Sequence, residues 1–194
     1  MTPASDPKTS DNIIAADAPL PASATGILTV DLDAIVANWR KLSSQAVPAD
    51  CAAVVKADAY GCGITQVTRA LAKAGCRTFF VATLDEARAA RDVTPTSAIY
   101  VLDGFFPGAG DQYAKYDCRP VIGDSTELAE WDAFRKTSGW DGQAAIHIDT
   151  GMNRLGFRIP EAEALLPRIR NGNHGISLVM SHLVSAELLN DPSN

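Results

Sequence analysis

The sequence predicts an α/β fold in which helices cover a parallel sheet. The first observation is an alternation of six short apolar segments, each typical of a strand, with segments that have helical spacing. The second is composition, because 46% of the 194 residues are hydrophobic and 21% are charged, as in globular proteins. A doubly wound open sheet and a (β/α)8 barrel both fit this alternation. The first turn, KADAYGCG, matches neither GxGxxG nor a Walker loop, which favours the barrel.

The predicted elements begin after a tail. Residues 1–24 are dominated by Pro, Ala, Ser and Asp and are expected to form a flexible tail. The β-branched residues in 27–32 predict a strand, and 33–44 predict a helix with Asp31 or Asp33 as its N-cap.

Six strand–helix units follow in order. The strands are expected at 52–57, 78–84, 98–104, 119–124, 143–151 and 176–182. The helices between them are expected at 64–75, 85–92, 106–116, 125–139 and 161–172. Local signals mark several boundaries: Gly75 as a C-cap, Thr83 with Glu86 as a capping box, Asp124 or Ser125 as an N-cap, Pro160 in a first turn and Pro167 as a kink.

Charge and cysteine content narrow the functional classes. The net charge is -6 and no basic block occurs, which argues against nucleic acid or an anionic membrane as a partner. No apolar run reaches the roughly 20 residues of a membrane span, and residues 1–24 lack the pattern of a secretory signal. The cysteines form no CxxC pair, so we expect reduced thiols in the cytoplasm and no metal site.

Length sets a further expectation. A complete barrel takes about 250 residues, whereas the segment after the tail, 25–194, is shorter and its last predicted strand lies close to the end of the sequence. We therefore interpret 25–194 as a partial barrel domain, about six of eight strands, and the chain as the N-terminal part of a longer enzyme or a truncated product of one.

Candidate catalytic residues are those that follow the strands, because barrel active sites lie at the carboxyl ends. Lys56 ends an apolar run, so we expect its amine to be desolvated, with a lowered pKa and the reactivity of a nucleophile or base. The alternative is a lysine that extends from the strand end into water.

Four further residues are candidates on the same reasoning. The guanidinium of Arg154 suits a carboxylate ligand, or else an internal pair with Asp149. His182 suits a base, a ligand or a flat surface for a cofactor ring. Tyr60 suits an anion through its hydroxyl, or packing in a turn. His147 shares a strand face with Asp149, an arrangement typical of core or network positions.

Three stretches together resemble the alanine racemase family: VVKADAYGCG (54–63), HIDTGMNRLGF (147–157) and MSHLVSAE (180–187). The lead-in TVDLDAIVANWR also resembles the opening of that family. The resemblance implies a barrel that binds pyridoxal 5'-phosphate and interconverts L-alanine and D-alanine, usually to supply peptidoglycan synthesis. It also implies a homodimer and a C-terminal β-domain that is missing here.

The resemblance implies specific residue roles. Lys56 holds the cofactor covalently and exchanges the Cα proton on the face that handles D-alanine, and Tyr60 contacts the cofactor phosphate. Arg154 helps bind the substrate carboxylate beside the cofactor, and His182 lies against the cofactor ring. His147 and Asp149 have supporting roles. The base for the opposite face is a tyrosine of the partner subunit's β-domain, and no residue of this chain takes that role.

Two positions depart from the family pattern. The family usually has histidine where Cys62 stands, and often a lysine, sometimes carbamylated, where His147 stands. The alternative function is a single-domain protein that binds pyridoxal phosphate without turnover, as in a related barrel family that lacks the β-domain. The motifs around Lys56 and Arg154 favour the racemase.

Overall fold

The computed structural model describes residues 25–172, 174–188 and 190–194. The predicted tail, 1–24, lies outside the described residues. The chain divides into two units, Met1–Val30 and Asp31–Asn194, and every helix and strand of the described residues lies in the second. None of the described helices combines the length and the apolar character needed to cross a lipid bilayer.

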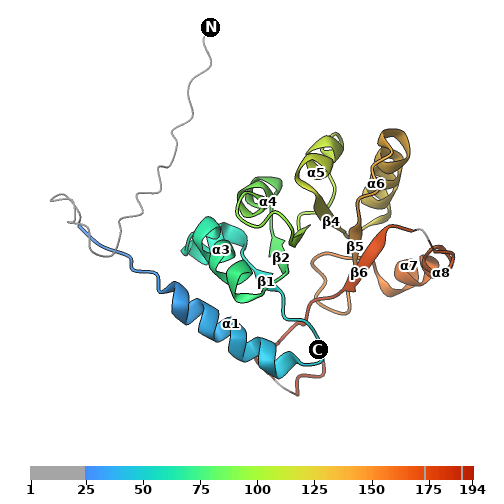
Figure 1. Ribbon diagram of the computed structural model, residues 1–194. Helices are drawn as coiled ribbons and strands as arrows, with labels where there is room; N and C mark the ends of the chain where they lie inside the picture. Colours follow the sequence, from blue (N-terminus) through green and yellow to red (C-terminus); the bar gives the residue numbers. More distant parts are fainter. Residues whose placement is uncertain (1–24, 173, 189) are drawn as a thin grey trace, which may run out of the picture. The chain divides into compact units, whose positions relative to one another are not determined.

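One parallel sheet forms the centre of this unit (Figure 1). Its strands are β1 (Ala53–Val54), β2 (Thr78–Val81), β3 (Ala98–Val101), β4 (Cys118–Ile122), β5 (Ala144–His147) and β6 (Ile176–Met180). Each strand pairs in parallel with the next in sequence, so the order is β1-β2-β3-β4-β5-β6. A doubly wound sheet reverses its order at a switch point, whereas a barrel adds each strand beside the last. The predicted incomplete barrel is therefore confirmed.

One helix precedes β1, and the helices that follow strands β1 to β5 lie on one side of the sheet (Figure 1). They are α1 (Leu32–Ala46), α2 (Lys56–Gly61), α3 (Ile64–Ala74), α4 (Leu84–Arg91), α5 (Gly110–Tyr116), α6 (Ser125–Ser138), α7 (Ile159–Ala164) and α8 (Leu166–Arg170). The helix α1 packs against α3, and the indole N–H of Trp39 donates to the carbonyl of Cys51 at 3.0 Å. This contact ties α1 to the chain entering β1.

The predicted caps are present at the helix ends. Asp31 accepts the Ala34 N–H at 2.9 Å and begins α1. Thr83 and Glu86 form the capping box of α4, and Asp124 caps α6. Gly75, the expected C-cap of α3, adopts the left-handed conformation at the end of that helix. Side-chain oxygens satisfy N–H groups that a helix leaves unpaired, which is why these short sequence signals located the boundaries correctly.

Three expectations about elements need correction. The predicted strand 27–32 is wrong: Leu32 is the first residue of α1, and Ile27 and Leu28 are exposed. A β-branched segment becomes a strand only when a neighbour pairs with it, and among the described residues β1 pairs only with β2. The helix expected from 106 begins at Gly110, because the positive φ of Gly108 is not helical. The helix expected over 161–172 is instead two short helices, α7 and α8.

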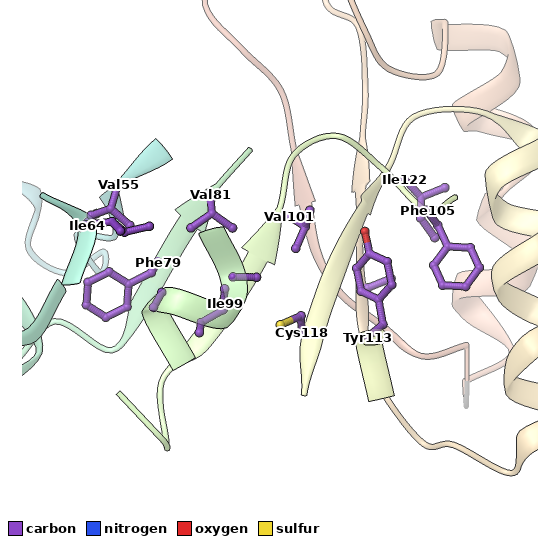
Figure 2. Packing of buried hydrophobic residues seen from close by; sticks show 14 of the residues in the cluster. Val55, Ile64, Phe79, Val81, Ile99, Val101, Phe105, Tyr113, Cys118 and Ile122 are labelled. Carbon is purple, nitrogen blue, oxygen red and sulfur yellow. The ribbon is translucent and has the colours of Figure 1, made fainter. Parts of the chain in front are cut away.

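The core lies mainly between the sheet and the helices (Figure 2). Phe79, Val81, Ile99 and Val101 point toward the helices and are fully buried. The alternate residues form a second apolar cluster on the opposite face, made by Tyr100, Val121 and Ala145 with Phe80, Leu178 and Met180 against them. A parallel sheet with two apolar faces is typical of a barrel, whose interior is filled by side chains. The carboxyl ends of the strands are then free to carry a site.

Candidate active site

The predicted site residues all lie at the carboxyl ends of strands. Lys56 comes two residues after β1, and His147 is the last residue of β5. Arg154 lies in the loop after β5, and His182 comes two residues after β6. Because all six strands are parallel, these positions share one edge of the sheet. That edge is where barrel enzymes place their catalytic groups.

The turn after Lys56 has an unusual backbone. Ala57, Asp58, Ala59 and Tyr60 have φ angles of 52°, 54°, 53° and 56°, so α2 contains a left-handed turn made without glycine. Each such residue costs roughly 1–2 kcal/mol relative to a right-handed conformation. Strain of this kind persists only where surrounding contacts impose it, and it is concentrated at functional sites.

Hydrogen bonds hold this turn at both ends. The Ala59 N–H donates to the carbonyl of Val55 at 2.9 Å, which closes the turn over Lys56. Asp58 accepts the Ile64 N–H at 2.7 Å and ties the far end of the turn to α3. Glu86 accepts the Ala57 N–H at 2.7 Å at the near end. Lys56 itself is half-buried, and Tyr60 is 66% exposed.

The loop that carries Arg154 is built around Asp149. One carboxylate oxygen of Asp149 accepts the N–H groups of Gly151 and Asn153, both at 3.0 Å. Both bonds lower the pKa of Asp149, and the bond from Asn153 has the larger effect. Asn153 adopts a φ of 55° and donates from its side chain to the Gly151 carbonyl at 2.9 Å. The loop is therefore shaped by its own polar groups.

The base of the same loop is closed by main-chain bonds. The Asp149 N–H donates to the Phe157 carbonyl, and the Phe157 N–H donates to the His147 carbonyl, each at 2.8 Å. A Cβ at Gly156 would lie 2.8 Å from the Asp149 nitrogen, so only glycine fits there. Arg154 is exposed, and no ion pair with it is found among the described residues. The guanidinium is thus not held by Asp149, the alternative considered for it.

His147 connects this loop to the segment after β6. It is 9% exposed, and its pKa is lowered by burial first and then by electrostatic interaction with His182 and Arg154. The exposed His182 places Nδ1 2.6 Å from the carbonyl of Leu183. A carbonyl can only accept, so Nδ1 carries a proton and donates it to Leu183.

The structure therefore brings the predicted residues together in two groups. Arg154, His182 and Asp149 lie within electrostatic range of His147 at the β5–β6 end of the sheet. Lys56 and Tyr60 stand on the turn after β1, at the other end of the strand order. Among the residues described, no hydrogen bond or ion pair joins the two groups directly.

Sequence reasoning assigned Glu86 only a capping role. Its contact with the residue after Lys56 was missed, because the capping-box spacing already accounted for this glutamate. The available signal was its place in the first turn of α4, near the carboxyl end of β2, which shares its edge of the sheet with Lys56.

The fold and this edge define a class: a parallel β/α barrel domain with a lysine-bearing turn and an arginine-bearing loop at the carboxyl ends of its strands. Comparison with known proteins identifies the family within that class. Residues 30–194 match the family model described as alanine racemase, N-terminal domain. The chain belongs to the alanine racemase family.

Individual relatives agree with this assignment. The chain is 52% identical over 164 residues to an alanine racemase of Methylobacterium nodulans, covering 84% of this chain and 44% of the relative. It is 41% identical over 173 residues to one of Rhizobium meliloti, covering 89% and 45%. The chain thus spans less than half the length of these curated relatives.

Solved structures show the same fold. The alanine racemase of Bartonella henselae with covalently bound pyridoxal phosphate superposes with a TM-score of 0.78 at 36% identity, covering 85% of this chain and 48% of that one. The enzyme from a D-cycloserine-producing Streptomyces lavendulae gives a TM-score of 0.75 at 29% identity, covering 84% and 44%.

Proposed function

We propose that the chain is the cofactor-bearing part of a pyridoxal-phosphate-dependent alanine racemase, which interconverts L-alanine and D-alanine. The observation that supports this most strongly is the left-handed turn beside Lys56. The chain belongs to the alanine racemase family, and one solved structure of that family has covalently bound pyridoxal phosphate. By the same family reasoning, the enzyme acts in the cytoplasm as a homodimer and supplies D-alanine for peptidoglycan.

The residues at the carboxyl edge fit this cofactor chemically. A lysine amine can condense with an aldehyde, and a tyrosine hydroxyl and an arginine guanidinium can donate to anionic oxygens. Lys56, Tyr60 and Arg154 supply these three groups from the same edge of the sheet. A flat imidazole, that of His182, can lie against an aromatic ring. Pyridoxal phosphate, when bound, supplies an electron sink for charge that develops at the α-carbon of the substrate.

Lys56 has two duties in the proposed reaction. Its amine anchors the cofactor and, once released, takes and returns the Cα proton on one face of alanine. A proton can be exchanged repeatedly at one atom only if the amine returns to the same place. The left-handed turn, held to α3 and α4 by hydrogen bonds, fixes the chain that leaves Lys56.

Arg154 binds the carboxylate of alanine in the proposed complex. A guanidinium stays charged at every physiological pH and offers paired donors to a carboxylate. His147 supports it by remaining neutral, because its lowered pKa avoids adding a positive charge beside Arg154. Asp149 supports it by shaping the loop.

Racemisation also needs a proton on the opposite face of alanine, and we assign that role to no residue of this chain. The alternative, a single-domain protein that binds the cofactor without turnover, is not favoured by the match to the N-terminal domain of alanine racemase.

The proposal is tested on the whole racemase of which this chain forms the cofactor-bearing part, with added pyridoxal phosphate. We expect a visible absorbance band, a borohydride-trapped adduct on Lys56, and D-alanine formed from L-alanine. Lys56→Ala should lose all three, whereas Lys73→Ala, at an exposed position in α3, should lose none. Arg154→Ala should keep the adduct but raise the KM for alanine. An adduct that persists in Lys56→Ala would refute the assignment.

A further inference from the structure

Glu86 connects two neighbouring β/α units at the carboxyl edge of the sheet. One oxygen of its carboxylate, Oε1, accepts the N–H of Ala57 at 2.7 Å. The other, Oε2, accepts the N–H of Ala82 at 2.7 Å and that of Thr83 at 3.3 Å. Ala57 follows Lys56, and Ala82 follows the last residue of β2. The half-buried side chain therefore bridges the segments that leave β1 and β2.

The bridge exceeds what helix capping requires. A capping box needs only the mutual bonds between Thr83 and Glu86, which are both present. The bond to Ala57 reaches across 29 positions in sequence to a different unit. Its donor is the first of the four left-handed residues, so the bond is made where the strained backbone begins.

The geometry demands a carboxylate in particular. All three partners of Glu86 are N–H donors, and they approach its two oxygens separately. A carboxylate can accept at both oxygens, whereas the amide of glutamine has one acceptor and one donor end. Glutamine would therefore place an NH₂ group against at least one backbone N–H and lose one side of the bridge. Aspartate keeps the charge but is shorter by one methylene.

We propose that Glu86 is a positioning residue for Lys56: its carboxylate anchors the strained turn to the end of β2 and so holds the lysine amine in place for pyridoxal phosphate. This inference rests on the proposed function of Lys56. Glu86 acts through the Ala57 N–H and is not itself a catalytic group.

The test measures how fast the intact apoprotein captures pyridoxal phosphate on Lys56. Capture is followed by visible absorbance and by borohydride trapping with peptide mass analysis. We expect Glu86→Gln and Glu86→Asp to slow capture by roughly tenfold or more, since a displacement of about 1 Å can cost on the order of 10²-fold. Circular dichroism checks that each variant is folded.

Thr83→Ala is the matched control. It removes the N-cap of the same helix but leaves the carboxylate of Glu86 in place, so capture should stay within about twofold of the unsubstituted protein. Equal slowing in Thr83→Ala would mean that general loss of α4 is responsible, and would overturn the inference. Capture by Glu86→Asp at the rate of the unsubstituted protein would show that the negative charge alone suffices, and this result would also overturn the inference.

Two further outcomes keep the proposal separate from its premise. If the unsubstituted protein forms no adduct on Lys56, the proposed function fails; if it does and Glu86→Gln captures equally fast, only the role of Glu86 fails. If the Glu86 variants do not fold, hydrogen exchange of the Ala57 amide in the unsubstituted protein tests whether Glu86 holds this N–H. Slow exchange is expected, and exchange at the rate of an unprotected amide would contradict the bridge.

Discussion

The carboxylate of Asp149 accepts the backbone N–H of Asn153 at 3.0 Å, and this contact bends the chain just before Arg154. The same oxygen also accepts the Gly151 N–H at 3.0 Å. The position of the proposed carboxylate-binding guanidinium therefore depends on an acceptor five residues earlier, with which it forms no ion pair of its own.

A pair of substitutions at Asp149 tests this dependence. Asp149→Ala removes both bonds and should raise the KM for alanine by roughly tenfold, because substrate-positioning groups tolerate little displacement. Asp149→Asn keeps an oxygen that can accept both N–H groups and should have a much smaller effect. Steady-state racemisation kinetics measure both. Similar KM values for the two variants would indicate that the carboxylate charge, rather than loop geometry, matters.

His147 should make stability depend on pH below neutrality. Its pKa is lowered in the folded protein, mainly by burial, so near its ordinary value of 6.5 the unfolded chain binds protons that the folded chain does not. Stability should therefore fall as the pH drops from 6.5 through the lowered pKa. His147→Gln removes this titration and should make the decline of stability with falling pH less steep. Urea unfolding at several pH values measures the slope, and identical slopes would contradict the assignment.

Much of the fold was predictable because it depends on local pattern. Six apolar segments became six parallel strands, and the caps at Asp31, Thr83 and Asp124 formed where side-chain acceptors precede helical spacing. The strand prediction for 27–32 was wrong because β-propensity does not indicate whether a neighbouring strand is available for pairing. The clustering of Arg154 with His147 and His182 followed from the rule that parallel strands end at one edge.

Two features of the site could not be predicted in the same way. The left-handed turn after Lys56 opposes the local preference of four residues that have a Cβ atom, so no propensity argument indicates it. The bridge from Glu86 to Ala57 joins residues that are distant in sequence. Both depend on tertiary contacts that outweigh local preference, as is expected where function requires a strained backbone.

Cys118 should make stability depend on pH in the alkaline range. It is fully buried in β4, and burial raises the pKa of its thiol from 9.0 to about 12. The stability that the protonated thiol contributes to the fold is complete below pH 9.0 and is lost as the pH rises toward 12. Between these values the unfolded chain releases the thiol proton, whereas the folded chain keeps it. Cys118→Ala should cost about 1 kcal/mol near neutral pH through lost packing. Its deficit should narrow at alkaline pH, as measured by denaturant unfolding; a constant deficit would contradict the shift.

Gly156 should be the least replaceable glycine of the Arg154 loop. Its φ is +112°, and an added Cβ would lie 2.8 Å from the Asp149 nitrogen and 3.0 Å from the His147 carbonyl oxygen. Gly156→Ala should therefore destabilise the fold by roughly 2–4 kcal/mol, as backbone clashes do, and raise the KM for alanine in whatever protein remains folded. The matched control is Gly139→Ala at the C-cap of α6, where φ is +70° but nothing lies within 4 Å of the added Cβ. That variant should cost only about 1 kcal/mol, the conformational penalty alone. Denaturant unfolding compares the two, and equal costs would show that the close approach to β5 is relaxed at little expense.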